Sequence, residues 1–351
     1  MPGAAFINRI GTALPPYEAH EAFIGWADRR IADQRERAVF RRMASRSGIA
    51  KRWSVLPRPS GGDQTSAGGF YQHDFMPPTS ARMAIYAEAA PALSVAAARD
   101  LGSLEGVTHL VLASCTGFIA PGIDQIVAKL LDLPPTIERT LIGFMGCYAA
   151  VAALRTARHI TRSEPDARVL VVTVELCTLH LQPEDELEQI LAMLLFGDGA
   201  AAAIVSSEPT GLEITGLFST TLADSGELIG WTIGDVGFKM TLSGAVPARI
   251  AEAASGPDFR ARIGDPGAID SWAVHAGGRS VLDAVEQGFD LAPDALEPSR
   301  RVLHECGNMS SATLMFVLER ILAAGDPIDN GVAIAFGPGL AAEGFRYRRA
   351  T

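Results

Sequence analysis

The sequence predicts an α/β protein with a largely buried sheet, built in two halves. Helical spacing of Ala, Leu and Val alternates along the chain with short, continuous apolar runs of four to seven residues. Runs of that length, bounded by Gly, Asp or Pro, are typical of strands that are buried on both faces. The 351 residues are enough for about two domains. Both halves show the same alternation, which indicates an α/β architecture throughout.

Each expected element follows from its local pattern. Apolar residues at three- and four-residue spacing predict helices over Ile31–Ser47, Ser80–Leu101, Cys147–Ile160 and Ser311–Ala323. Short apolar or β-branched runs predict strands over Thr108–Ser114, Val169–Val174, Ala200–Ser206, Trp272–His275 and Val332–Phe336. Residues 58–68 are expected to form a polar loop.

The junction between the halves is expected in the polar segment 206–211, Ser-Ser-Glu-Pro-Thr-Gly. The predicted units are therefore residues 1–207 and residues 208–351. No repeat is visible in the sequence, so any duplication of the two halves would be structural.

Composition excludes several classes of protein. Hydrophobic residues make up 48% of the chain and charged residues 20%, which is typical of an ordered globular protein rather than of disorder, collagen or a coiled coil. The longest apolar stretch, residues 191–205, is interrupted by Gly-Asp-Gly at 197–199, so no membrane span is expected. Arg9 and the two prolines at 15–16 break the short apolar stretch near the start, so we expect no signal peptide and a cytoplasmic location.

Charge is distributed unevenly. The net charge of −10 argues against a nucleic-acid binder, which needs a broadly basic surface. Ten of the 30 basic residues nevertheless fall between Arg29 and Arg58. This basic patch suits a phosphorylated small ligand. A solvated helix face is the alternative.

The sequence lacks the motifs of several kinds of catalytic and cofactor-binding sites. The four cysteines are far apart, which supports neither a disulfide framework nor a zinc knuckle. There is no phosphate-binding G-x-x-x-x-G-K-[ST], no complete dinucleotide fingerprint and no G-x-S-x-G. The seven histidines show no H-E-x-x-H spacing, so a metal site would have to be assembled from distant residues. We expect no metal, ATP or NAD cofactor.

Three residues at the ends of expected elements could form a catalytic site. Cys147 opens a helix, where the helix dipole and free N–H groups stabilise a thiolate, although a packed cysteine is the alternative. His275 ends a strand before Gly277-Gly278, and a structural role is its alternative. Asn308 precedes a helix and could simply cap it. Together they predict a Cys-His-Asn site in which His and Asn donate to an oxyanion or enolate.

Five segments resemble one family of enzymes. They are Gly-Cys-Tyr-Ala-Ala at 146–150, Leu-Phe-Gly-Asp-Gly at 195–199, Val-His-Ala-Gly-Gly at 274–278, Gly-Asn-Met-Ser-Ser at 307–311 and Phe-Gly-Pro-Gly-Leu at 336–340. Their order and intervals, along roughly residues 5–350, are similar to those of type III polyketide synthases, the chalcone-synthase-like enzymes. The resemblance implies a thiolase fold, layered αβαβα with two structurally duplicated halves. It also implies a homodimer that acts on acyl-CoA and malonyl-CoA without an acyl carrier protein.

The resemblance assigns roles to individual positions. It implies that Cys147 is the acyl-loaded nucleophile, and that His275 and Asn308 promote malonyl decarboxylation and stabilise the enolate. Phe196 would be one gatekeeper, and the second gatekeeper phenylalanine of the family falls on Met240.

The CoA-contacting basic residues of the family fall on Arg42 and Arg46, inside the basic patch. A further lysine of the family falls on Val39, a loss for which Arg35, Arg41 or Lys51 would have to compensate.

The predicted cavity residues depart from the plant pattern. Threonines of the family fall on Cys115, Cys177 and His180, its cross-subunit methionine on Ala120, and a glycine on Trp231; Ser310 completes this group. Trp in place of Gly should close the space for a bulky aromatic starter. We therefore expect a bacterial-type enzyme that uses an aliphatic acyl-CoA or malonyl-CoA starter. Cys177 is either an auxiliary cavity thiol or a packing residue.

The expected reaction is iterative decarboxylative condensation of malonyl-CoA on a starter held as a Cys147 thioester, followed by cyclisation to a pyrone, resorcinol or related phenolic. One enzymatic alternative is a single-step ketoacyl synthase of the fatty-acid type, which shares the fold and the Cys-His-Asn logic. An alternative of another class is a non-catalytic thiolase-fold subunit that binds acyl chains.

Overall fold

The strands of the main sheet form one hydrogen-bonded series in two parts. The computed structural model describes residues 3–72 and 76–351. The order is β11-β12-β13-β8 in the second half of the chain, followed by β1-β7-β6-β4-β5 in the first half. The strands are β1 Phe6–Ala13, β4 His109–Ser114, β5 Glu138–Gly143, β6 Val169–Leu176, β7 Asp198–Ser206, β8 Leu212–Thr221, β11 Ser271–Val274, β12 Gly331–Gly337 and β13 Ala341–Arg349.

The two parts of the sheet repeat one arrangement. In the first half β1 is antiparallel to β7, β7 is antiparallel to β6, and β6 is parallel to β4. In the second half β8 is antiparallel to β13, β13 is antiparallel to β12, and β12 is parallel to β11. Two residue pairs at the start of β1 join the parts. The expected structural duplication is therefore present although the sequence shows no repeat.

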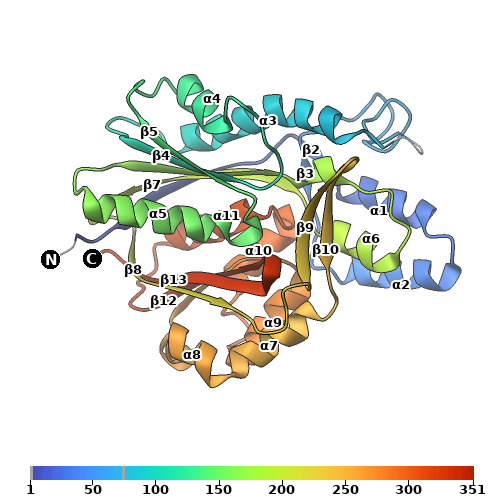
Figure 1. Ribbon diagram of the computed structural model, residues 1–351. Coiled ribbons are helices and arrows are strands. Elements are labelled where there is room, and N and C mark those ends of the chain that lie inside the picture. Colours follow the sequence, from blue (N-terminus) through green and yellow to red (C-terminus); the bar gives the residue numbers. More distant parts are fainter. Residues whose placement is uncertain (1–2, 73–75) are drawn as a thin grey trace.

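Helices make three layers around these strands (Figure 1). One apolar cluster packs α3 (Thr79–Asp100) and α4 (Ile123–Leu130) on the outer face of the first part of the sheet. A second cluster holds α5 (Ala149–Ser163) and α11 (Ser311–Ala324) between the two parts. A third cluster packs α7 (Val246–Ser255), α8 (Pro257–Ile263) and α9 (Arg279–Phe289) on the other outer face. Helix α10 spans Glu297–Cys306. The result is the layered αβαβα arrangement.

Smaller elements gather at one end of these layers (Figure 1). An apolar cluster joins α1, α2 and α6, which run from His20 to Arg30, Gln34 to Ser45 and Leu187 to Met193. Two short two-stranded sheets complete the described strands. One pairs β2 with β3 (Tyr17–Glu18 and Trp53–Ser54), and the other is the hairpin of β9 and β10 (Ile229–Gly234 and Gly237–Leu242). The basic patch predicted from the sequence lies mainly on α1 and α2.

The strands predicted as continuous apolar runs are present as β4, β6, β7, β11 and β12, each almost fully buried. The predicted helices are α2, α3, α5 and α11, with ends shifted by up to a few residues. Strands β5, β8 and β13 are not predicted, because polar residues interrupt their apolar pattern and part of each is exposed. Within the described residues, no helix is both long and apolar enough to cross a membrane.

Candidate active site

The three predicted catalytic residues line one cavity of about 900 Å³, although they come from different halves of the chain. Cys147 lies in the turn before α5, His275 follows β11, and Asn308 follows α10. Both predicted gate residues, Phe196 and Met240, line the same cavity. The fold thus brings five predicted site residues together around one space.

A sharp turn holds Cys147 at the base of the cavity. Gly146 has a φ of +78°, and a Cβ at this position would lie 2.4 Å from the Cδ atom of Pro338. Glycine is therefore required here for both its left-handed backbone and the close approach of the second half. Cys147 is buried, and burial raises the pKa of its thiol to about 12, although hydrogen bonds from Ser310 and Asn308 act to lower it. The stabilised thiolate expected from the helix start is thus outweighed by desolvation.

His275 is buried with both ring nitrogens free of hydrogen-bond partners in the described part of the chain. Its backbone N–H is fixed by the carbonyl of Ile334 at 2.8 Å, which extends the pairing of β11 with β12 by one residue. Burial lowers the pKa of His275 to about 3, so the imidazole is neutral at pH 7. A neutral imidazole without partners can accept a proton at one nitrogen and donate one from the other.

Asn308 is held by both ends of its amide. Its Nδ2 donates to the carbonyl of Gly277 at 3.1 Å, and its Oδ1 accepts from the backbone N–H of Ser310 at 2.8 Å. Asn308 does not cap α11, whose N-cap is Ser310 and whose first turn has no side-chain cap; this bond instead fixes the residue that precedes the helix. The amide nitrogen has two hydrogens. The hydrogen that does not go to Gly277 can serve the sulfur of Cys147 or a ligand in the cavity.

The two predicted gate residues are held in place by different contacts. The carbonyl of Phe196 accepts from Arg52 Nη1 at 2.6 Å, and its backbone bridges to Asn308. Met240 lies on β10 directly opposite Trp231 on β9. Phe196 is therefore fixed to Asn308 through the backbone, whereas Met240 belongs to a hairpin.

Arginines surround the mouth of the cavity. The predicted CoA contacts Arg42 and Arg46, at the end of α2, are both exposed and line it. Arg279 also lines it and donates to the carbonyl of Arg46 at 3.2 Å. Sequence reasoning missed Arg279, although a basic residue directly after the Gly277-Gly278 pair was a usable signal. Arg41 instead pairs with Asp28 at 2.6 Å.

An aromatic cluster fills the space around three predicted cavity residues. The ring of His180 stacks on Phe238 with centroids 4.2 Å apart, and Trp231 packs edge-on against both rings. Trp231 Nε1 donates to the carbonyl of Cys115 at 2.9 Å, and His180 is bonded to the carbonyl of Thr116 at 2.8 Å. Cys115, His180 and Trp231 therefore pack behind the main cavity instead of lining it.

The other predicted cavity residues occupy separate positions. Cys177 is buried and lines a second cavity of about 60 Å³, which shares Phe196 with the main one. Ser310 has a φ of +46°, a strained conformation of the kind found at functional sites, and its side chain acts to lower the pKa of the Cys147 thiol. Ala120 is exposed on the surface of the chain. Their proposed roles toward substrate stay predictions.

Sequence reasoning also missed a buried carboxyl group close enough to Cys147 to influence the pKa of its thiol. Glu175 is fully buried near the end of β6, and burial raises its pKa to about 7. It accepts from the backbone N–H of Cys115 and the hydroxyl of Thr116, both at 2.9 Å, and from the hydroxyl of Ser311. An acidic residue at the end of a continuous apolar strand was the available signal.

Profiles of two protein domains match nearly the whole chain. The N-terminal domain of chalcone and stilbene synthases matches residues 2–209, and the C-terminal domain of the same enzymes matches residues 213–350. The chain belongs to this family. The family and the thiolase fold predicted from the sequence are therefore confirmed.

Individual relatives agree with this family. The alpha-pyrone synthesis polyketide synthase-like Pks18 of Mycobacterium tuberculosis and of Mycobacterium bovis is 35% identical over 252 residues. This alignment covers 68% of the chain and 64% of the length of each relative, which is less than two thirds.

Among solved structures, the crystal structure of PKS-I from the brown alga Ectocarpus siliculosus has a TM-score of 0.88 at 30% identity, covering 99% of both chains. The C-terminal type III polyketide synthase domain of Steely1 from Dictyostelium also has a TM-score of 0.88. It is 24% identical, covers 99% of this chain and 100% of that domain, and supports the fold.

Proposed function

We propose that this protein is an iterative type III polyketide synthase that builds its product on Cys147. The observation that carries the proposal is the shared cavity, which holds Cys147, His275 and Asn308 at its base and arginines at its mouth. Arginine binds phosphate groups through several donors, so the mouth suits the phosphates of a CoA thioester. Acyl-CoA and malonyl-CoA are therefore the proposed substrates, and the reaction needs neither an acyl carrier protein nor a metal or nicotinamide cofactor.

The first step transfers the starter. His275 takes the proton of the Cys147 thiol, the sulfur attacks the thioester carbonyl of the acyl-CoA, and CoA leaves with the proton. The C–S bond to CoA breaks as the C–S bond to Cys147 forms. Asn308 Nδ2 and His275 donate to the oxyanion that develops at the carbonyl.

The second step extends the chain. Malonyl-CoA loses CO₂, and the electron pair of the broken C–C bond becomes an enolate that the same two donors stabilise. The enolate carbon attacks the Cys147 thioester, the cysteine sulfur leaves as a thiolate, and it regains a proton that is taken up from water. Transfer of the lengthened chain from CoA back to Cys147 begins another round, and cyclisation then gives a pyrone, a resorcinol or a related phenolic. The name of the relative, alpha-pyrone synthesis polyketide synthase-like Pks18, supports a pyrone as the product.

The aromatic cluster supports a compact starter. Because Trp231, His180 and Phe238 pack against one another behind the cavity, space for a bulky aromatic starter is filled in that direction. We therefore propose an aliphatic acyl-CoA or malonyl-CoA as the starter.

We also propose a homodimer and two domains. Strand β5 is an exposed edge of the sheet; Leu141 within it is 43% exposed, and Phe118 beside it is 44% exposed. An unpaired edge with exposed apolar side chains favours pairing with a second copy. The domain boundary is proposed after residue 207, in the segment between β7 and β8.

Product analysis tests the function. The purified protein is incubated with malonyl-CoA and starters from acetyl-CoA to stearoyl-CoA, together with coumaroyl-CoA, and the products are identified by mass spectrometry. Products of two or more extensions, absent with Cys147→Ala, are expected. One extension only would favour a single-step ketoacyl synthase. No product, with no acyl-CoA protection of Cys147 against alkylation, would favour a non-catalytic acyl-binding subunit.

A further inference from the structure

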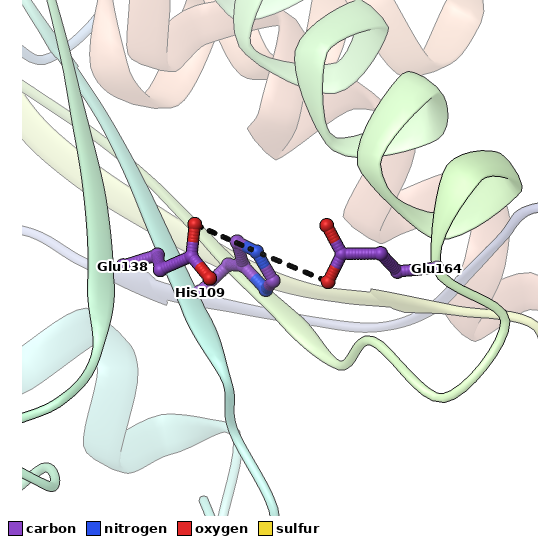
Figure 2. A group of neighbouring side chains, drawn as sticks. All are labelled: His109, Glu138 and Glu164. Carbon is purple, nitrogen blue, oxygen red and sulfur yellow. Dashed lines mark ion pairs between the residues drawn. The ribbon is translucent and has the colours of Figure 1, made fainter.

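Three side chains from distant parts of the sequence meet at the end of the sheet away from the cavity (Figure 2). His109 begins β4, Glu138 begins β5, and Glu164 follows the last turn of α5. One ring nitrogen of His109 and one carboxylate oxygen of each glutamate all lie within 4.8 Å of one another. Helix α5 begins just after Cys147 and has 15 residues. At 1.5 Å per residue, this group lies about 20 Å from the nucleophile.

His109 is oriented as a ligand. Its side chain is 8% exposed, and its Nδ1 is 2.8 Å from Thr108 Oγ1. The backbone N–H of Arg168 in turn donates to that hydroxyl at 3.0 Å. Nε2 points between the two carboxylates at 3.7 Å from each, and no atom of residues 3–72 or 76–351 hydrogen-bonds it. A histidine whose second nitrogen is fixed by a hydrogen bond is the usual arrangement of a metal ligand.

Apart from His109 itself, the described surroundings supply no basic side chain to the two carboxylates. Throughout the described residues, no lysine or arginine lies within 4.0 Å of the carboxylate of Glu138 or Glu164. Arg139, next to Glu138 in β5, pairs with Asp124 at 2.7 Å, and Arg168 pairs with Glu208. The carbonyl groups at the end of α5 add partial negative charge beside Glu164. A cation between the carboxylates would neutralise this site.

We propose that His109, Glu138 and Glu164 bind a divalent transition-metal ion such as Zn²⁺, with water completing the coordination. One imidazole and two carboxylates are donors that Zn²⁺ accepts, whereas Ca²⁺ and Mg²⁺ prefer oxygen ligands alone. Zn–N and Zn–O bonds of about 2.0–2.2 Å require the ligand atoms to draw closer. In the single chain the glutamates are 73% and 56% exposed, which leaves their side chains room to rotate inward. The ion would join β4, β5 and α5, and it takes no part in the proposed condensation.

Zinc titration by calorimetry tests the site. All proteins carry Cys147→Ala, so that the cavity thiol does not compete for the metal. One bound Zn²⁺ is expected, with affinity at least tenfold weaker after Glu138→Gln or Glu164→Gln and no binding at this site after both. Thr108→Val should weaken binding about tenfold through the lost support of His109. Glu105→Gln is the matched control, because Glu105 is exposed and precedes β4, and it should bind as the parent does.

Cobalt supplies an independent signal. Co²⁺ bound in place of Zn²⁺ should give a visible absorption band that the doubly substituted protein lacks. The thermal unfolding midpoint should rise with Zn²⁺ in the parent and stay constant in the double variant. Absence of binding at millimolar Zn²⁺, or equal binding by the double variant, would overturn the proposal. Neither result bears on polyketide synthesis. When Cys147 is intact, the substitutions Glu138→Gln and Glu164→Gln should leave product formation unchanged, because they lie about 20 Å from Cys147.

Discussion

The mouth and the base of the main cavity contrast in how they handle charge. At the mouth, the basic side chains of Arg42 and Arg46 are exposed to solvent. At the base, Cys147 and His275 are 6% and 1% exposed, and burial drives both toward their neutral forms. Solvent access therefore separates the two tasks. In the proposed reaction, we expect charged groups at the mouth to hold substrate and transition state equally, and buried groups at the base to stabilise charge that appears only during reaction.

The largest effect is expected when a hydrogen-bond donor is removed from the base of the cavity. Asn308→Ala should lower kcat by about 10²–10³-fold with little change in the KM for malonyl-CoA, because the lost donor acts on the developing oxyanion. Steady-state kinetics with malonyl-CoA checks this. Asn308→Asp is the control for structure, since it retains the acceptor for the Ser310 N–H but lacks the amide donor. If Asn308→Asp were as active as the parent, Asn308 would be a positioning residue only.

Burial at the base should also appear in the pH dependence of stability. The folded pKa of Glu175 is raised to about 7, above its ordinary value of 4.5, because the carboxyl group is desolvated. Its contribution to the free energy of unfolding is therefore fully present below pH 4.5 and is lost as the pH rises through about 7. Each pKa unit corresponds to 1.36 kcal/mol, so the loss is about 3 kcal/mol.

Denaturant unfolding of the parent and of Glu175→Gln at several pH values measures this difference. The free energy of unfolding of the parent should fall relative to that of the variant by about 2–3 kcal/mol between pH 5 and pH 8. The glutamine keeps the shape and remains neutral, so other titrating groups contribute equally to both proteins. Parallel curves would mean that Glu175 titrates near its ordinary pKa.

A third test concerns how a buried thiol becomes a nucleophile. Since desolvation penalises an isolated thiolate, Cys147 should ionise mainly by passing its proton to His275, which creates two opposite charges together. At pH 7.5 we expect alkylation of Cys147 by iodoacetamide to be about tenfold slower in His275→Ala. Mass spectrometry of the modified protein gives the rate. Equal rates in the two proteins would show that the helix start alone activates the sulfur.

Much of the fold follows from local pattern, and parts of it do not. Strands β4, β6, β7 and β12 are continuous apolar runs, so burial on both faces is legible in the sequence. The edge strand β5 carries polar and exposed residues, and its place is set by pairing with β4. Local pattern says nothing of such a long-range pairing.

The candidate site likewise contains residues that the sequence predicts and residues that it does not. Cys147, His275 and Asn308 stand at element ends, where their residue types already suggest chemistry. Trp231 closes space only because the β9–β10 hairpin brings it against His180, and Arg279 reaches the cavity only because α9 lies beside the end of α2. These roles arise from contacts between segments far apart in sequence, which one sequence does not specify.

The smallest effect on activity is expected for a substitution at the mouth of the cavity. Arg46→Ala should raise the KM for malonyl-CoA about three- to fivefold and leave kcat unchanged, because an exposed ionic contact is worth up to about 1 kcal/mol. The difference should shrink at high salt, which screens exposed charges. Arg41→Ala is the matched control, since Arg41 is on the same helix but pairs with Asp28 and does not line the cavity. A fall in kcat with Arg46→Ala would mean that the mouth and the base do not act separately.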